Sequence, residues 1–186
     1  MPDPGNYWAS DKDPYLDPKT GILKNIPGLE TQKQLDAFEE TLFQANFPAA
    51  TTYAELCRSF SFRDWQEIHK ICFSDIYEWA GSPRAVRISK GKTVFAYPET
   101  IVSQSAQYFN SLNDGLKKGD LTFEKCIEIY AELNVIHPFR EGNGRTQRIL
   151  FAALLKCIGY EADYTLLNGD ELIVDLLRKS GEVFLS

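Results

Sequence analysis

The chain has 186 residues and a formal net charge of −6, and its composition is 44% hydrophobic and 25% charged. These values are typical of one globular domain and exclude a wholly disordered chain. The acidic balance also argues against a protein that coats DNA or RNA through an excess of lysine and arginine. Any phosphate chemistry must therefore depend on a local cluster of basic residues.

Nothing in the sequence predicts a membrane span or a secretory leader. No apolar run approaches the roughly 20 residues that cross a bilayer, and residues 1–14 lack the basic and apolar regions of a signal peptide. No C-x-x-C pair occurs among the four cysteines, which are Cys57, Cys72, Cys126 and Cys157. We interpret them as buried, reduced thiols rather than a disulfide or zinc site, and this indicates a cytoplasmic protein.

Proline, glycine and aspartate dominate residues 1–28, which predicts an irregular N-terminal arm packed on the domain. The remainder, residues 29–186, shows no internal repeat and no low-complexity linker, so we expect a single domain overall. Its first helix is expected over residues 29–46.

A second helix is expected from Ser61, where Asp64 completes a capping-box pattern. Gly81 and Pro83 should end it. The apolar stripe of this helix has helical spacing and consists of Trp65, Ile68, Cys72, Ile76 and Trp79. We expect Trp65 and Trp79, like Trp8, to anchor the core rather than to stack on a nucleotide base.

Residues 84–97 alternate apolar and polar side chains around a Lys-Gly-Lys turn at 90–92, which predicts a short β-hairpin. Pro98 closes the hairpin, and a helix is expected from there to about Leu112. Asparagine, aspartate and glycine within residues 113–120 predict a loop.

A further helix is expected over residues 121–137, with apolar side chains in most directions, which predicts a central, buried helix. It must end near residue 137, because Pro138 disfavours helical dihedrals at the residue before it. Another helix should run from Asn143 to Gly159, and a last one near 169–179. The expected fold is all-α, with six to eight helices and one hairpin.

The most informative segment, residues 137–148, reads HPFREGNGRTQR. Two glycines, Gly142 and Gly144, allow backbone N–H groups to converge at the start of a helix, whose dipole also favours an anion. Arg145 and Arg148 lie three residues apart and so share one helix face. Two guanidinium groups beside such a nest can bind a polyphosphate through paired hydrogen bonds.

Two further side chains add chemistry to this segment. Glu141 could hold Mg²⁺, which usually takes one or two carboxylates together with phosphate oxygens and water. His137 could accept a proton from a hydroxyl group. Each feature has an ordinary structural explanation, as a buried histidine, a glycine turn or a solvated arginine pair, and a zinc pair is a weaker alternative. Together they favour nucleotidyl or phosphoryl transfer.

The twelve residues resemble the signature of Fic-domain proteins, H-P-F-x-[D/E]-G-N-G-R-x-x-R, at every defined position. Residues 15–25 (YLDPKTGILKN), 68–84 (IHKICFSDIYEWAGSPR) and the hairpin ISKGKTVFAYP are also similar to family segments. The resemblance implies the Fic fold and transfer of AMP from ATP to a serine, threonine or tyrosine hydroxyl of a target protein.

The resemblance also implies roles for the motif residues. His137 would be the general base, Glu141 would hold Mg²⁺ on the α- and β-phosphates, and Phe139 would fix the loop in the core. The phosphate-binding set would consist of Gly142, Asn143, Gly144, Arg145 and Arg148. Doc-type kinases carry lysine in place of Gly144, so a glycine here favours adenylyl transfer. A kinase, or transfer of phosphocholine or another phosphate-containing group on the same site, stays open, as does a catalytically idle interaction module.

The hairpin resembles the family's flap, whose edge would hold the target segment by strand addition. The resemblance places three flap residues near the nucleotide, namely Lys92, Thr93 and Val94. Lys90 and Lys92 can equally be explained as residues that keep the turn solvated. The other histidine, His69, is expected to be structural.

Many family members carry an inhibitory helix with the pattern [S/T]-x-x-x-E-[G/N], whose glutamate pairs with the second motif arginine. Residues 51–56 have the spacing but end in leucine, and residues 74–79 belong to the domain. The resemblance therefore implies a toxin-like enzyme inhibited by a small antitoxin that supplies a glutamate to Arg148. A missing C-terminal segment is the alternative explanation, and secretion as an effector is the alternative to a cytoplasmic location.

Overall fold

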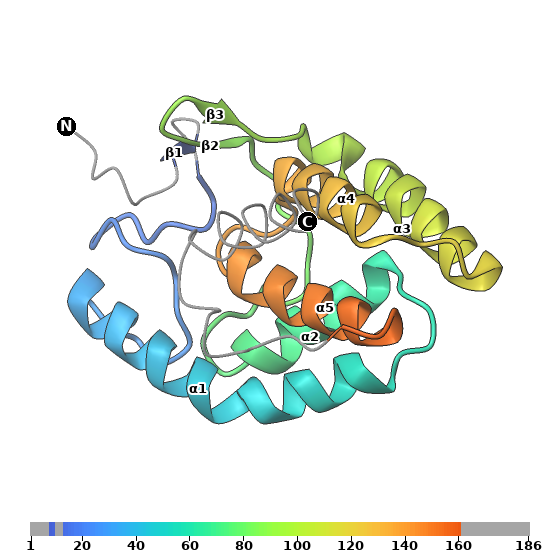
Figure 1. The fold of residues 1–186 in the computed structure, drawn as a ribbon. Coiled ribbons are helices and arrows are strands. Elements are labelled where there is room, and N and C mark those ends of the chain that lie inside the picture. The colour runs from blue at the N-terminus through green and yellow to red at the C-terminus, as the bar shows by residue number, and fades with distance from the viewer. Residues whose placement is uncertain (1–7, 10–12, 161–186) are drawn as a thin grey trace.

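The computed structural model describes residues 8–9 and 13–160, and this part of the chain is mainly helical (Figure 1). Its helices are α1 (Gln32–Leu56), α2 (Phe62–Phe73), α3 (Ile101–Lys118), α4 (Phe123–Ile136) and α5 (Asn143–Cys157), with a 3₁₀ turn at Pro98–Thr100. Its strands are β1 (Trp8–Ala9), β2 (Ile88–Lys90) and β3 (Thr93–Val94). The all-α prediction is confirmed, with five α-helices in the described residues. The helix expected near 169–179 and the side chain of Trp8 lie outside them.

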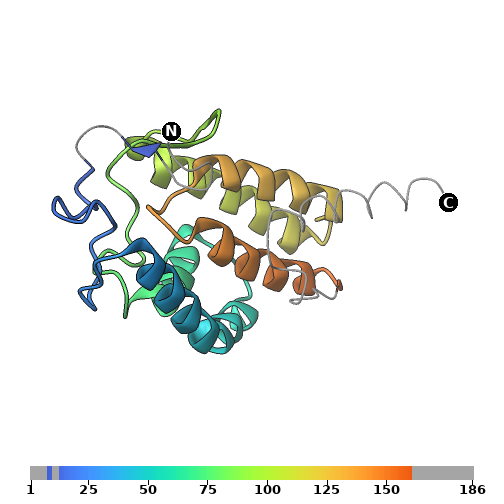
Figure 2. The same cartoon turned by 90° about the vertical axis from the view of Figure 1, so that its left-hand side faces the viewer.

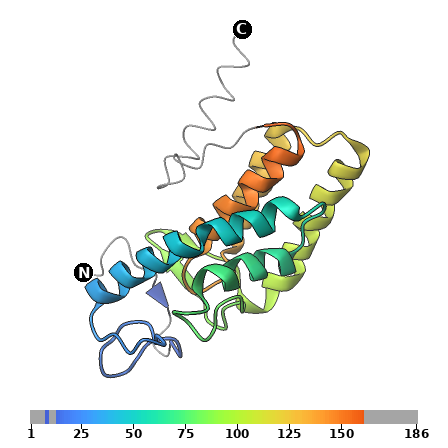
Figure 3. The ribbon, with the colours of Figure 1, turned by 90° about the horizontal axis from the view of Figure 1, so that it is seen from below.

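The helices form three layers, and α5 is the middle one. Figure 3 shows α1 and α2 side by side on one face of α5, and Figure 2 shows α3 and α4 on its other side. The expectation that residues 121–137 form the central helix is wrong, because α4 buries one face only and leaves Val135 50% exposed. The central helix is α5, whose residues 149–155 are all buried. A helix that is apolar all round is stable only in such a position.

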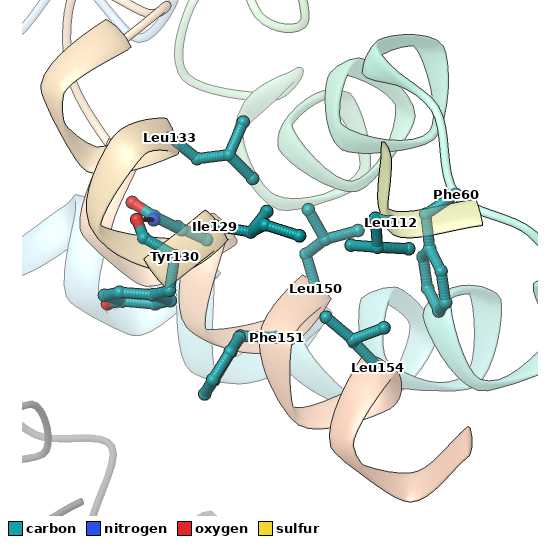
Figure 4. Close-up of a pocket in the computed structure, with 9 residues that line it drawn as sticks. Phe60, Leu112, Ile129, Tyr130, Leu133, Leu150, Phe151 and Leu154 are labelled. Atoms are coloured by element: carbon teal, nitrogen blue, oxygen red, sulfur yellow. Dashed lines mark hydrogen bonds between the residues drawn. The ribbon is translucent and has the colours of Figure 1, made fainter. Parts of the chain in front are cut away.

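Apolar side chains from α3 and α4 pack against those of this central helix (Figure 4). They leave a cavity of only about 10 Å³, about the room of one water molecule. The cavity is lined by Phe60, Leu112, Ile129, Tyr130, Leu133, Gln147, Leu150, Phe151 and Leu154. The layer between α4 and α5 is therefore close-packed core, and ligand chemistry must take place elsewhere.

Helix α1 is longer than the sequence predicts, since it runs to Leu56 rather than to residue 46. It passes through Pro48, which lacks the N–H that would bond the previous turn, at a typical cost of about 3 kcal/mol. Ala50 and Ala54 beyond the proline are fully buried. Packing of this continued face against the core outweighs the local preference of proline to end a helix.

Helix α2 begins as predicted, with the reciprocal capping box between Ser61 and Asp64 present. It ends at Phe73, earlier than expected, so Ile76 and Trp79 lie in the turns that follow the helix. Ile76 is fully buried there, while Trp79 is half-buried. The apolar stripe thus identified core residues correctly but overestimated the length of the helix.

The loop expected within residues 113–120 is confirmed at Gly119 and Asp120 but wrong at 113–115, because α3 continues through Asn113 and ends at Lys118, with Gly119 as its left-handed cap. The Asn113 side chain donates to the carbonyl of Phe60 (2.7 Å) and accepts from its N–H (2.9 Å). This long-range contact satisfies the asparagine side chain in a helix, where it would otherwise compete with the backbone.

The predicted hairpin is present as β2 and β3 and belongs to a three-stranded antiparallel sheet in the order β1-β2-β3. Strand β1 comes from the N-terminal arm and covers the β2 edge, so β3 forms the other edge (Figure 1). The arm is also attached by Asp13, whose carboxylate accepts from Arg140 at 2.8 Å in an ion pair with both side chains almost fully buried. The described part of the arm is therefore held against the domain by the sheet and by this ion pair.

All four cysteines are free, but they are not all buried. Cys72 and Cys126 are buried, whereas Cys57 is half-buried and Cys157 is exposed at the end of α5. The expectation of four buried thiols is wrong for these two. In the described part of the chain, no helix is long and apolar enough to cross a membrane.

Candidate active site

The segment that links α4 to α5 is built around two residues in left-handed conformations. His137 ends α4 with φ 49° and ψ 64°, and it is the only non-glycine residue with a positive φ in the described residues. Gly142 starts α5 with φ 78°. A left-handed histidine persists only where its surroundings hold it, and such strain concentrates at functional sites. The predicted helix end before Pro138 is confirmed.

The loop between these two residues is closed by the side chain of Asn143. Its amide donates to the carbonyl of Phe139 and accepts from the N–H of the same residue, both at 2.8 Å. Phe139 is fully buried and packs edge-on against Trp65. The Asn143 side chain therefore stabilises the loop, and only its backbone N–H is available for the anion-binding role that the sequence suggested.

His69 stabilises the loop through hydrogen bonds of its buried ring. It is fully buried, and its Nδ1 accepts from the N–H of Gly81 (3.0 Å) while its Nε2 lies 2.9 Å from the carbonyl of Glu141. Since Nδ1 accepts, Nε2 must carry the proton and donate it. Burial lowers the pKa of His69 to about 3, so the ring is neutral. The structural role expected for His69 fits these contacts.

The His137 ring is held in one tautomer. Its Nδ1 lies 3.0 Å from the carbonyl of Asn134, so Nδ1 is protonated and donates. The basic lone pair is therefore on Nε2. Phe95 of the flap stacks on the ring, with centroids 3.9 Å apart. Burial, together with the charges of Arg84 and Lys90, lowers the pKa of His137 to about 3. The imidazole is neutral at physiological pH and can accept a proton.

A cleft of about 360 Å³ lies beside this ring. It is lined by Lys90, Thr93, Phe95, Asn134, His137, Glu141, Gly142, Gly144, Arg145 and Arg148. The structure thus brings together the motif residues that the sequence singled out, except Asn143. Of the predicted flap residues, Thr93 lines the cleft, whereas Lys92 and Val94 are exposed and do not. Sequence reasoning missed Phe95 and Asn134.

The N-terminus of α5 forms one wall of the cleft. Its first residue follows Gly142, and no side chain caps the helix. The first N–H groups of a helix have no partner within it and carry the positive end of the dipole. A Cβ atom at Gly142 would lie 2.5 Å from the Phe73 ring, so no other residue fits there without displacement. This wall is suited to a phosphate group.

Glu141 provides a carboxylate at the mouth of the cleft. Its Oε1 accepts from the N–H of Gly142 (2.9 Å) and lies 3.7 Å from the Arg145 guanidinium. Burial and the nearby charge of Glu39 raise the pKa of Glu141 above its ordinary value. No group of three histidine, cysteine, aspartate or glutamate side chains is arranged for a metal in the part of the chain that the structure describes. A single half-exposed carboxylate fits Mg²⁺, which takes its other ligands from phosphate and water.

Arg145 has partners that the sequence did not reveal. The Arg145 guanidinium forms an ion pair with Glu39 of α1, and the Tyr77 hydroxyl donates to the same carboxylate. Arg145 also lies over the Phe73 ring, 4.8 Å from its centroid. Glu39 was not identified from the sequence, although its spacing of four residues from Leu35 and Phe43 puts it on the buried face of α1.

The chain is similar to known proteins in both sequence and fold. The sequence profile of the Fic/DOC family matches residues 59–155. A probable protein adenylyltransferase, y4lH of Sinorhizobium fredii, is 35% identical over 178 residues, which are 92% of this chain and 91% of the relative. The probable protein adenylyltransferase Fic of Escherichia coli is 32% identical over 164 residues, which are 84% of this chain and 79% of the relative.

Solved structures share the fold. The effector BepC of Bartonella tribocorum, a crystal structure with bound AMPPNP, has a TM-score of 0.72 at 21% identity and covers 87% of this chain and 85% of its own. The profile match spans just over half of the chain and contains the loop before α5 and α5 itself up to residue 155. Together with the relative that is 35% identical over almost its whole length, this match shows that the chain belongs to the Fic/DOC family.

Proposed function

We propose that this protein is a protein adenylyltransferase, which transfers AMP from ATP to a serine, threonine or tyrosine hydroxyl of a target protein. One observation carries the proposal. The lone pair of the neutral His137 ring, the N-terminus of α5, Glu141 and Arg148 all border a single cleft of about 360 Å³. The relatives named protein adenylyltransferase, and the AMPPNP bound to the Bartonella effector, support the same activity.

His137 acts as the general base in this mechanism. As the hydroxyl oxygen of the target attacks the α-phosphorus of ATP, its proton passes to His137 Nε2. The bond from the α-phosphorus to the bridging oxygen breaks, and pyrophosphate leaves with the electron pair. The Nδ1–H hydrogen bond to Asn134 keeps the ring oriented throughout. The ring releases the proton to solvent afterwards and is then neutral again.

The phosphates are bound by the other side of the cleft. The N–H groups at the start of α5 and the guanidinium of Arg148 stabilise their negative charge. Glu141 would hold Mg²⁺, which supplies additional positive charge to the phosphates when it is bound. A side chain at Gly144 would extend toward Arg148, since a Cβ there would lie 3.2 Å from its Nη1. A glycine at this position keeps a side chain away from Arg148, which supports nucleotide binding and adenylyl transfer over the kinase alternative.

Target and inhibitor are further parts of the proposal. The β3 edge of the sheet, which β1 does not cover, is the place where an extended target segment would add as a strand. A small antitoxin would inhibit the enzyme by placing a glutamate on Arg148. The four free cysteines suit a reducing compartment, so we place the reaction in the cytoplasm.

Label transfer in a cell extract tests this function. The protein is incubated with Mg²⁺ and with ATP labelled on either the α- or the γ-phosphate, and a His137→Ala variant serves as the control. Protein-bound label from the α-position only, absent with the variant, is the expected result. Label from the γ-position only would show kinase chemistry. No label from either position in an extract known to contain intact ATP would contradict the proposal.

A further inference from the structure

Arg84 is a buried arginine that neither the proposed mechanism nor the signature motif uses. It lies between α2 and β2, and only 2% of it is exposed. Its guanidinium donates to four backbone carbonyls: those of His137 (2.8 Å), Ile136 (3.1 Å), Val86 (2.6 Å) and Ala96 (2.6 Å). Its own N–H donates to the carbonyl of Pro138 at 2.8 Å. Arg84 therefore contacts the backbone on both sides of the left-handed turn.

These four carbonyls belong to two different segments. Two are at the C-terminus of α4, where carbonyl groups lack partners within the helix and the dipole favours a cation. The other two are at the base of the flap, one of them next to Phe95, which stacks on the His137 ring. The rigid five-donor guanidinium can bond both segments at once, which the single point charge of a lysine cannot do.

A buried cation held only by carbonyls is expensive, because burial disfavours its charged form. In the described residues, Arg84 forms no ion pair with a carboxylate. Burial lowers the pKa of Arg84 to about 10, so it is still charged at neutral pH. An apolar side chain of the same volume would avoid the cost of burying a charge, but it would leave the four carbonyls without a donor. Arg84 therefore serves to bond all four carbonyls at once.

We propose that Arg84 is a positioning residue for the general base, which fixes the His137 carbonyl in its left-handed turn and joins that turn to the flap residue stacked on the imidazole. The inference rests on the proposed function, since it assigns Arg84 a part in the step that His137 performs. Because Arg84 does not line the cleft, its removal should affect turnover and leave ATP binding nearly intact.

Several charges surround the His137 ring. Arg84 lies behind its backbone, Lys90 comes from β2, and Glu141, Arg145 and Arg148 line the same cleft. Of these, the positive charges of Arg84 and Lys90 favour the neutral form of the ring. Loss of Arg84 thus removes both an anchor of the turn and a charge that opposes protonation.

Kinetics of three variants test the proposal. Arg84→Met removes every side-chain donor, and Arg84→Lys keeps the charge without the planar set of guanidinium donors. Asn113→Ala breaks another side-chain contact with the backbone, that between α3 and Phe60, neither of which lines the cleft. The assay is the initial rate of α-label transfer to extract protein as a function of ATP concentration. Misplacing a reacting group by about 1 Å typically costs about 100-fold in rate. We expect that loss in kcat for Arg84→Met, about 10-fold for Arg84→Lys, and a KM for ATP within about threefold of wild type for both.

Asn113→Ala should lower the melting temperature and keep the wild-type kcat, which separates positioning from a general loss of stability. If Arg84→Met does not fold, the kcat of Arg84→Lys is the test. A folded Arg84→Lys or Arg84→Met enzyme with wild-type kcat would overturn the proposal. So would an equal fall in kcat for Asn113→Ala at a temperature where all variants are folded.

The imidazole signals in NMR spectra give a second reading that does not need activity. The chain has only two histidines, and a His137→Ala spectrum assigns them. We expect the His137 ring to stay neutral down to about pH 5 in wild type. In Arg84→Met the His137 signals should shift and the ring should titrate at a somewhat higher pH, since burial of the ring remains and only the charge of Arg84 is lost, with His69 unchanged. Unchanged His137 signals in a folded Arg84→Met variant would contradict the proposal. A wild-type protein without transfer activity would instead refute the proposed function, and the NMR reading would still stand.

Discussion

Gly142 is a position where a single added methyl group should be costly. Its φ of 78° is in the left-handed region, and a Cβ atom would lie 2.5 Å from Cε2 and 2.8 Å from Cζ of Phe73. That ring is fully buried and packs against Phe43 and His69, so it has little room to move. Gly142→Ala therefore combines backbone strain with overpacking at the start of α5.

The two effects can be estimated separately. A left-handed conformation costs a residue with a Cβ about 1–2 kcal/mol, and forcing extra volume into a packed core costs about 1–3 kcal/mol. We therefore expect Gly142→Ala to lower the free energy of unfolding by about 2–5 kcal/mol. In a domain of this size each kcal/mol lowers the melting temperature by about 2–4 °C.

Gly119→Ala is the matched control. Gly119 also has a positive φ, 70°, but a Cβ atom there would meet nothing within 4 Å, so only the backbone cost of about 1–2 kcal/mol applies. Urea unfolding at neutral pH measures both variants. Equal losses at the two positions would refute the argument that Phe73 blocks the space beside Gly142.

Three more outcomes are expected from the contacts of the site. Glu39→Gln should destabilise the fold by about 1–3 kcal/mol, since Arg145 loses its carboxylate partner. The control Glu40→Gln, on the exposed face of α1, should change the free energy of unfolding by less than about 0.5 kcal/mol. Urea unfolding measures both variants. His69 and His137 each have a pKa lowered by burial to about 3. In the unfolded chain both histidines take up protons near pH 6.5. The contribution of each histidine to the free energy of unfolding is therefore complete above that pH and falls by about 1.4 kcal/mol for each pH unit below it. His137→Asn should lose half of this dependence between pH 7.5 and 5.5, and a variant with the full dependence would contradict it. Chelation of Mg²⁺ with EDTA should abolish label transfer without changing the melting temperature measured in the absence of ATP, and full transfer in EDTA would refute a need for the metal.

The active-site loop could be predicted from the sequence because its determinants are local. Pro138 fixes the end of α4, and the glycine at 142 permits the left-handed start of α5. The capping box at Ser61 likewise depends on residues three apart. Where the neighbouring residues alone decide the backbone, the sequence is sufficient.

Long-range contacts account for the errors. Asn113 is a typical turn residue, yet it lies within a helix because its side chain bonds the backbone of Phe60, 53 residues away. Pro48 is tolerated inside α1 because the helix face beyond it is buried. Arg84 and Glu39 escaped notice for the same reason, since a charged residue reveals its buried partners only after the chain has folded.

The surroundings of Arg145 bear on the charge of the site. Arg145 is paired with Glu39, which lies outside the cleft, and Glu141 lies 3.7 Å from the same guanidinium, so the charge of Arg145 is already compensated. The cleft is also lined by two other basic side chains, those of Lys90 and Arg148. A triphosphate brings several negative charges into this space, more than two side chains and a helix dipole of about half a charge neutralise. The Glu141 carboxylate, which reduces the positive charge of the site, is also the ligand through which a divalent cation can restore it. The balance of side chains therefore suits the nucleotide together with its metal ion better than the nucleotide alone.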